Sequence, residues 1–404
     1  FPTAMAAGGF DAVIGNPPYG ALFEKDEKAY IRSHYESYRY KYDSYIYFIE
    51  RAVNLTKSNG WVGFITPELW LRLENCQPLR QLIAKKVGFD RIHVFGEKVF
   101  SNAVVNTVVF FLQRDTYREY LQVETVKDSW QISTASWQDN ELLSIDYRLK
   151  PGVREIIDKI HANQAPLQDF GKIIQGLTPY DRYRGQDPDL IKRRGYHFDH
   201  KKNDTCGKWL RGRDIARYIQ TWGGEWLSYG PWLAAPRDPS FFEGPRLLFR
   251  EVPGKNKRIQ ATFVEETLYY GHSITPFKPT QECKMSMKYF LGLVNSYLLS
   301  WYGKLILPNF GKDTFPKLNP QDIKQLPIRT IDFDDPADVA RHDEMVALVE
   351  RMLALHRQLA EAKTPQAKRL LKQQIDVTDR AIDRLVYQLY GLTGDEIAIV
   401  EGAT

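Results

Sequence analysis

An amide, two prolines and a tyrosine follow one another at Asn16, Pro17, Pro18 and Tyr19, directly after the apolar run Phe10–Gly15. The apolar run predicts a short buried strand. The prolines stiffen the backbone beyond it and present carbonyl acceptors without N–H donors. In open α/β sheets, ligands bind at the carboxyl ends of strands. The four residues therefore indicate a ligand site, with an ordinary strand-ending Asn-Pro turn as the alternative interpretation.

The tetrapeptide resembles the catalytic loop of amino-group methyltransferases that use S-adenosylmethionine. The resemblance implies that Asn16 and Pro17 offer their oxygens to both hydrogens of the adenine N6 amine, whose lone pair is otherwise delocalised into the ring. Positioning and electrostatics would then carry the in-line attack on the sulfonium methyl group. Tyr19 would stack on the base, which must first be flipped out of the duplex. Asn16, Pro17, Pro18 and Tyr19 are thus the candidate catalytic residues.

The residues that follow have the periodicity of alternating helices and strands. The expected elements, in order, are a helix over 42–55, a strand over 61–66, a helix over 67–86 that Pro67 begins, and strands over 89–95 and 104–112. This order resembles the second half of a class I, Rossmann-like S-adenosylmethionine methyltransferase sheet. The resemblance therefore implies an α/β catalytic domain of which this chain carries one part.

Phe100 lies between the last two expected strands. In adenine methyltransferases of the restriction–modification type, a phenylalanine at the matching place packs edge-on against the flipped adenine. The resemblance makes Phe100 a second base-stacking residue, and a position in the core is the alternative.

The glycine-rich turn that cradles S-adenosylmethionine in this class precedes the catalytic loop, and nine residues before Phe10 leave no room for it. We therefore expect the C-terminal part of a longer enzyme, inactive alone. Its partner would be the missing N-terminal half of the same polypeptide, which could also carry a nuclease. The strand over 10–15 would then expose an apolar edge.

Positive charge is concentrated in the middle of the chain. The whole chain has a formal charge of +5, but residues 163–260 alone hold 18 Lys and Arg against 11 Asp and Glu, interleaved with tryptophans and tyrosines. A basic, aromatic-rich region is an expected footprint for phosphate contact and groove reading in double-stranded DNA. The candidate DNA-binding residues are Arg211, Arg213, Arg250, Lys255, Lys257 and Arg258.

Two further segments resemble parts of restriction–modification methyltransferases. The region from about 166 to 331 resembles their target-recognition domain, at Ile173–Gly176, Trp209–Ile215 and Leu326–Ile328. Beyond 334, apolar stripes over 342–359 and 368–390 predict a helical hairpin, and Thr393-Gly394-Asp395-Glu396 predicts a capping box. The ending resembles single-chain type IIG restriction–modification proteins.

Composition restricts the remaining possibilities. Cys76, Cys206 and Cys283 are too few and too widely spaced for a disulfide framework, which indicates a reducing, cytoplasmic setting. His197, His200 and Cys206 lack a second ligand cluster, so we expect no metal. The apolar segment 289–307 is interrupted by polar residues, so we expect no membrane span.

The sequence thus predicts three parts, a partial methyltransferase domain over 1–150, a mixed α/β target-recognition domain over 151–333 and a helical extension over 334–404. The predicted function is sequence-specific methylation of adenine N6 in DNA from S-adenosylmethionine, within a restriction–modification enzyme. A glutamine or RNA methyltransferase, in which the same tetrapeptide holds a different planar amide or amine, is one alternative. A pure DNA-recognition fragment is the other.

Overall fold

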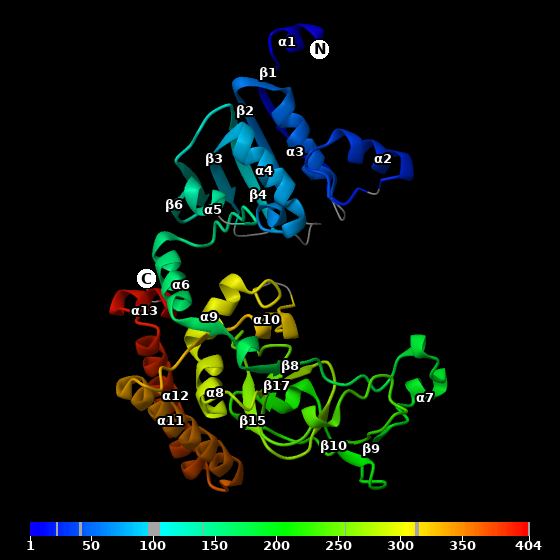
Figure 1. The fold of residues 1–404 in the computed structure, drawn as a ribbon, viewed down its shortest axis with the longest axis vertical. Helices are drawn as coiled ribbons and strands as arrows, with labels where there is room; N and C mark the ends of the chain where they lie inside the picture. Colours follow the sequence, from blue (N-terminus) through cyan, green and yellow to red (C-terminus); the bar gives the residue numbers. More distant parts are fainter. Residues whose placement is uncertain are drawn as a thin grey trace. The chain divides into compact units, whose positions relative to one another are not determined.

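The computed structural model describes residues 1–21, 23–39, 43–95, 106–139, 141–254, 256–311 and 315–402 (Figure 1). The chain divides into two compact units, unit 1 over Phe1–Arg154 and unit 2 over Glu155–Thr404. The C-terminal helices belong to the same compact unit as the region before them, and the three-domain division stays a prediction.

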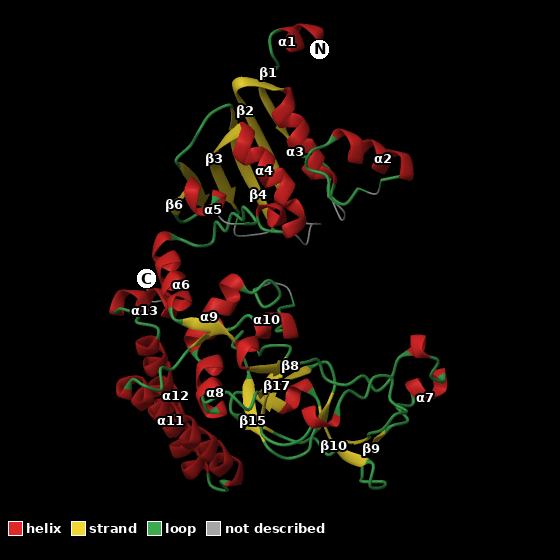
Figure 2. Cartoon of the chain, in the orientation of Figure 1, coloured by secondary structure: helices red, strands yellow, loops and turns green. Residues whose placement is uncertain are grey.

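Unit 1 is a mixed sheet with helices (Figure 2). Its helices are α1 Pro2–Ala6, α2 Lys25–His34, α3 Ser44–Leu55, α4 Gln77–Lys86 and α5 Thr134–Gln138, with short 3₁₀ turns η1 Glu68–Leu71 and η2 Glu74–Cys76. Its strands are β1 Phe10–Gly15, β2 Thr56–Pro67, β3 Val87–Val94, β4 Thr107–Arg114, β5 Tyr120–Thr125 and β6 Ser129–Ser133. The strand order is β1-β2-β4-β3-β5-β6. β1 and β2 run parallel, and β4 lies antiparallel between β2 and β3.

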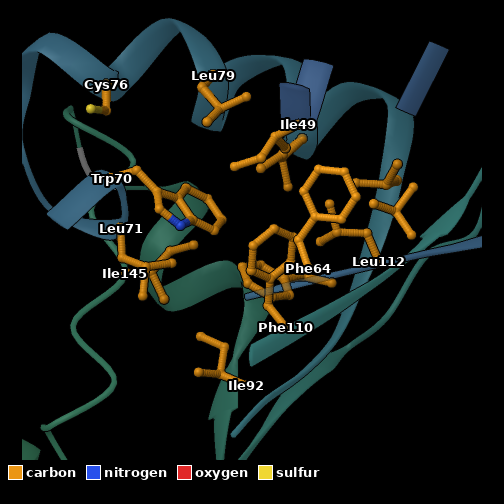
Figure 3. Packing of buried hydrophobic residues seen from close by; sticks show 14 of the residues in the cluster. Ile49, Phe64, Trp70, Leu71, Cys76, Leu79, Ile92, Phe110, Leu112 and Ile145 are labelled. Carbon is orange, nitrogen blue, oxygen red and sulfur yellow. The ribbon is translucent and has the colours of Figure 1, made fainter. Parts of the chain in front are cut away.

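One face of this sheet is packed against α3 and α4, because alternate residues of each strand point toward them. Figure 3 shows Phe64, Phe110 and Leu112 of the sheet meeting Ile49 of α3 and Leu79 of α4. The Trp70 ring packs edge-on against the Phe110 ring in this core, with ring centroids 5.1 Å apart. The Trp70 indole N–H donates to the Thr66 hydroxyl at 3.0 Å. The core fixes the ends of β1 and β2, where the tetrapeptide begins.

The α/β fold class expected for this region is confirmed, with two local differences. The expected helix over 67–86 is instead η1, η2 and α4, because the extended backbone at Leu73 (φ −62°, ψ 138°) interrupts it, and Pro78 lies in the first turn of α4, where a proline is tolerated. The strand expected over 61–66 instead extends from Thr56 to Pro67, and the chain bulges out of it near Asn59, whose φ is 61°.

The opposite face and the β1 edge of the sheet are open among the described residues. Trp61, Val109 and Phe111 on this face line a shallow hollow of about 660 Å³. Of the strands in the described ranges, β1 pairs only with β2, and Ile14 on it is 83% exposed. The expected apolar edge is therefore present.

Unit 2 combines small sheets with longer helices. Its helices are α6 Pro151–Ala162, α7 Pro188–Lys192, α8 Met287–Asn295, α9 Tyr297–Ile306, α10 Pro320–Lys324, α11 Pro336–Glu361, α12 Pro365–Leu389 and α13 Gly394–Glu401. Its strands are β7 Gln164–Pro166, β8 Gly171–Ile173, β9 His197–Phe198, β10 Cys206–Leu210, β11 Ile215–Ala216, β12 Ile219–Gln220, β13 Trp226–Ser228, β14 Arg246–Arg250, β15 Ala261–Val264, β16 Tyr269–Tyr270, β17 Ile274–Pro279 and β18 Pro327–Arg329. The two larger sheets have the orders β15-β14-β17-β8 and β16-β10-β13-β9.

The C-terminal helices form the expected hairpin, α11 and α12. The capping box at Thr393 is also present and opens α13. α11 packs closely on α8, since a Cβ added at Gly292 would lie 2.3 Å from the Met345 sulfur. The apolar segment 289–307 falls within α8 and α9, which are separate helices because the Ser296 backbone is extended and its hydroxyl caps α9. Among the described residues, no helix is long and apolar enough to cross a membrane.

Two carboxylates of α12, Asp379 and Asp383, tie the hairpin to the rest of unit 2. Arg217 donates to both oxygens of Asp379, at 2.9 Å through one guanidinium nitrogen and more closely through the other. Arg258 lies 3.5 Å from Asp383 and 3.8 Å from Asp379. Both arginines also donate to the Asn295 carbonyl oxygen, at 3.1 and 2.7 Å. We call these five residues the hairpin anchor.

Candidate active site and nucleic-acid interface

The tetrapeptide lies where β1 and β2 both end. Tyr19 points its hydroxyl at the Asn16 side-chain oxygen, 2.9 Å away, and at the Ile65 carbonyl oxygen of β2, 3.3 Å away. At Gly15 a Cβ would lie 3.3 Å from the Phe64 ring, so the absence of a side chain lets β1 approach this core residue. The strand ends therefore set where Asn16 stands.

Asn16 is exposed, Pro17 is buried and Tyr19 is half-buried. The Tyr19 ring meets Tyr45 of α3 edge-on, with centroids 6.2 Å apart. Burial raises the pKa of Tyr19, so its hydroxyl remains a proton donor at neutral pH. An amide oxygen has two lone pairs, so Asn16 can accept one more hydrogen bond while Tyr19 stays in place.

Two residues at the start of α3, Asp43 and Ser44, hold the far end of the tetrapeptide. The buried Ser44 hydroxyl donates to the Pro18 carbonyl oxygen at 2.5 Å. The Gly20 backbone N–H donates to an Asp43 carboxylate oxygen at 2.7 Å. Sequence reasoning missed both residues. The available signal was a pair of helix-starting types, Asp and Ser, ahead of the periodic run.

The remaining base-stacking candidate, Phe100, lies outside the described residues, and its role stays a prediction.

The candidate residues Lys257 and Arg258 lie in the loop of the hairpin formed by β14 and β15. Lys257 is half-exposed at its turn, where its backbone N–H donates to the Gly254 carbonyl oxygen at 2.8 Å. Lys255 lies outside the described residues. Arg258 is placed differently from the prediction: it is 9% exposed and belongs to the hairpin anchor. Neighbouring residues of a tight turn point to opposite sides, which composition alone does not reveal.

The other candidate arginines differ in their exposure and in whether their guanidinium groups already have partners within the protein. Arg213, in the 3₁₀ turn Gly212–Asp214, is exposed and has no hydrogen-bond or ion-pair partner within the described part of the chain. Arg211 pairs with Glu225 at 2.8 Å, which raises the pKa of this arginine. Arg250 is half-buried at the end of β14, 3.3 Å from the Gln260 side-chain oxygen. Arg213 is therefore the arginine most available to a ligand among these three.

No group of three or more metal-ligating side chains occurs within the described ranges. His197 instead pairs its Nδ1 with the Tyr180 hydroxyl at 2.9 Å, and burial lowers the pKa of His197 to about 4. Cys206 lies 3.2 Å from the Asn203 side-chain oxygen.

Comparison with known families gives two matches on separate parts of the chain. Residues 1–100 match the Eco57I restriction-modification methylase. Residues 207–328 match the TaqI-like C-terminal specificity domain. The first match contains the tetrapeptide and Asp43 and Ser44. The second contains the β14–β15 hairpin and Arg213.

Curated relatives include a type II restriction enzyme and methyltransferase, RM.Eco57I of Escherichia coli. It is 21% identical over an alignment that covers 97% of this chain and 47% of the relative. The type II methyltransferase M.TthHB8I of Thermus thermophilus is 32% identical over 25% of this chain and 25% of its own length. The chain thus spans about half the length of RM.Eco57I.

A solved structure, the Type IIL restriction-modification enzyme MmeI in complex with DNA, shares the fold. Its TM-score is 0.57 at 12% sequence identity, over 97% of this chain and 56% of that chain.

Proposed function

Residues 1–100 carry an Eco57I-type restriction-modification methylase segment and residues 207–328 a TaqI-like specificity domain, and from this we propose an adenine-N6 DNA methyltransferase. In this proposal the chain is the C-terminal part of a restriction–modification enzyme of the type IIG kind. Unit 1 presents the target amine and unit 2 selects the DNA sequence.

The observation that carries the proposal is the acceptor pair at the strand ends. The Asn16 side-chain oxygen keeps a free lone pair, and the Pro17 carbonyl oxygen has no hydrogen-bond partner among the described residues. Two acceptors at adjacent residues suit an amine with two hydrogens. Held there, the nitrogen is pulled toward tetrahedral geometry and its lone pair becomes available for in-line attack. S-adenosylmethionine, when bound, supplies the methyl group.

Asp43 and Ser44 fix the geometry of this pair. Because Ser44 binds the Pro18 carbonyl oxygen, the peptide between Pro18 and Tyr19, directly after the acceptor pair, is held in one orientation. Tyr19 stands beside Asn16 and supplies an aromatic ring for stacking, a contribution of about 1–3 kcal/mol per base. An adenine in a duplex reaches this place only when it is flipped out, which costs a few kcal/mol.

The open β1 edge and the open face of the sheet support the proposal that the cofactor-binding half of the enzyme packs there. β1 has no second neighbour among the strands that the structure describes, and parallel strands are normally covered on both faces of their sheet. In our proposal, the strands that carry the main S-adenosylmethionine cradle continue the sheet beyond β1, and their helices cover Trp61 and Phe111. The relative RM.Eco57I has about twice the length needed to match this chain, which is consistent with such a half.

Nucleoside analysis tests the proposal. Duplex DNA incubated with S-adenosylmethionine and an intact enzyme that carries this chain should yield N6-methyldeoxyadenosine after digestion. The same digestion distinguishes methylation of cytosine, and parallel incubations with RNA and protein test the alternative substrates. Methyl incorporation only into RNA or into glutamine side chains would reject the proposal.

Salt titrations test the DNA contacts of unit 2. Lys257→Ala should weaken binding to all duplex sequences and lower the slope of log affinity against log salt by about 0.9, the value for one lost phosphate contact. Loss of an arginine that reads a base should instead cost about 1–3 kcal/mol, mainly on the cognate site. Arg213→Ala is the first such variant to examine, with Arg211→Ala and Arg250→Ala beside it.

Equal affinity and slope for Lys257→Ala and the unaltered chain would show that the β14–β15 turn lies away from DNA. Arg258 is omitted from this series because its replacement would disturb the hairpin anchor.

A further inference from the structure

An aromatic–arginine tip projects from unit 2 ahead of the matched specificity segment. Residues 180–195, which we call the arm, contain the 3₁₀ turn Arg182–Arg184 and the helix α7. Figure 1 shows α7 at the end of a projection from the sheets of unit 2. At this turn Tyr183 is 81% exposed, among the most exposed large side chains of the described residues.

Hydrogen bonds hold the arm in one conformation, which distinguishes it from an ordinary surface loop. Asp181 caps the 3₁₀ turn by accepting the Tyr183 backbone N–H at 2.9 Å, and Gly185 ends the turn with a φ of 74°. The Gln186 side chain accepts from the Asp181 backbone and donates to the carbonyl oxygens of Pro179 and Trp232, at 2.8, 3.1 and 3.1 Å.

Two further contacts hold the base of the arm. Arg184 donates to the Ala234 carbonyl oxygen at 2.6 Å. The rings of Tyr180 and Tyr196 stack with centroids 5.3 Å apart, and the Tyr196 backbone N–H donates to the Tyr180 hydroxyl at 2.8 Å. The fold therefore orders the whole arm and still leaves Tyr183 in water. Ordering before binding reduces the entropy lost on binding.

Charge at the tip identifies the kind of ligand. The Arg182 guanidinium lies over the Tyr183 ring, 4.6 Å from its centroid, and donates to its hydroxyl. Arg182, Lys192 and Arg193 have no ion pair within the described part of the chain. The nearby Asp181 and Asp187 carboxylates cap the 3₁₀ turn and α7, Asp181 also lies 3.8 Å from Arg184, and Asp189 is a further carboxylate in the first turn of α7. An exposed aromatic ring beside cations without ion pairs fits a polyanion with flat apolar groups between its phosphates.

We propose that the arm is a DNA-contacting element, in which Tyr183 enters a groove of duplex DNA and Arg182 contacts a phosphate. This inference rests on the proposed function, because it adds a contact to the DNA that unit 2 binds. Side chains that enter a groove contact bases and sugars, whereas phosphate contacts set the salt dependence. The two residues should therefore be separable by experiment.

The test is fluorescence anisotropy of the 404-residue chain with a pool of 30-base-pair duplexes of random sequence, over a series of salt concentrations. Tyr183→Ala should weaken binding about tenfold with an unchanged salt slope. Arg182→Ala should lower the slope by about 0.9. Tyr183→Phe should bind like the unaltered chain, since the ring makes the contact.

Matched controls are Tyr117→Ala, which removes a tyrosine that is 73% exposed in unit 1, and Arg351→Ala on the exposed side of α11. Circular dichroism of each variant should show unchanged folding, as Tyr183 is not part of a core. If the unaltered chain binds DNA and Tyr183→Ala behaves like Tyr117→Ala, the proposed DNA contact of the arm is rejected while the proposed function stands. If the unaltered chain has no affinity for duplex DNA, the arm is overturned together with the proposed DNA binding by unit 2, while methyl transfer by the intact enzyme is decided by the nucleoside analysis.

Discussion

An intact enzyme that carries this chain should lose methyl transfer when Asn16 is replaced by alanine, while its affinity for DNA is unchanged. In the proposed mechanism the side-chain oxygen of Asn16 is one of two acceptors that orient the amine, so the loss should fall on kcat. Removing one preorganised hydrogen-bonding group from an active site costs about 10²–10³-fold. Single-turnover transfer of a labelled methyl group measures this loss directly.

Asn16→Asp is the informative companion because it keeps an acceptor oxygen at the same place and should retain part of the activity. Asn54→Ala removes an exposed amide from α3 and is the control for unspecific effects. Tyr19 keeps the Ile65 carbonyl oxygen as an acceptor in the alanine variant, so the loop should remain folded. Normal turnover by Asn16→Ala would remove the tetrapeptide from the mechanism.

The second large effect should appear in stability, on replacing Asp379 by alanine. This change leaves Arg217 and Arg258 with Asp383 as their remaining carboxylate in the hairpin anchor. Removing one partner of a buried ion pair costs about 3–5 kcal/mol. The side chains of Arg217 and Asp379 are about one-fifth exposed, so we expect the low end, about 3 kcal/mol. Urea unfolding of the 404-residue chain, followed by tryptophan fluorescence, measures it.

Asp376→Ala is the matched control, since Asp376 is an exposed carboxylate one turn away on α12. It should change the free energy of unfolding by less than about 0.5 kcal/mol. An equally small effect of Asp379→Ala would mean that the anchor contributes no net stability to unit 2.

The elements with a strong periodic or capping signal were predictable from the sequence. β1, α3 and the α11–α12 hairpin occur where their patterns indicated, and the capping box at Thr393 opens α13. The tetrapeptide was also recognisable, because two consecutive prolines after an apolar run leave few conformations. Its bracing by Ser44 was not, since a contact over 26 residues depends on how α3 packs against the sheet.

Which basic residues are buried and which stay at the surface could not be predicted from the sequence either. Composition showed that 163–260 is basic, but not that Arg258 turns inward while Lys257 stays at the surface. The difference arises from carboxylates more than 100 residues away on α12, whose position only the tertiary fold determines. Arg182 and Tyr183 were not predicted as ligand-binding residues, because their local sequence does not show that the loop around them is rigid.

The hairpin anchor sets the size of the piece that can be exchanged between enzymes of this kind. The matched specificity segment, 207–328, contains Arg217 and Arg258, whereas Asp379 and Asp383 lie beyond its end. A chimera that transplants this segment alone would bring two guanidinium groups against whatever side chains the recipient's own helices present. Grafting residues 155–404 together keeps donors and acceptors matched, so a change of DNA specificity by recombination should use the start of unit 2 as its junction.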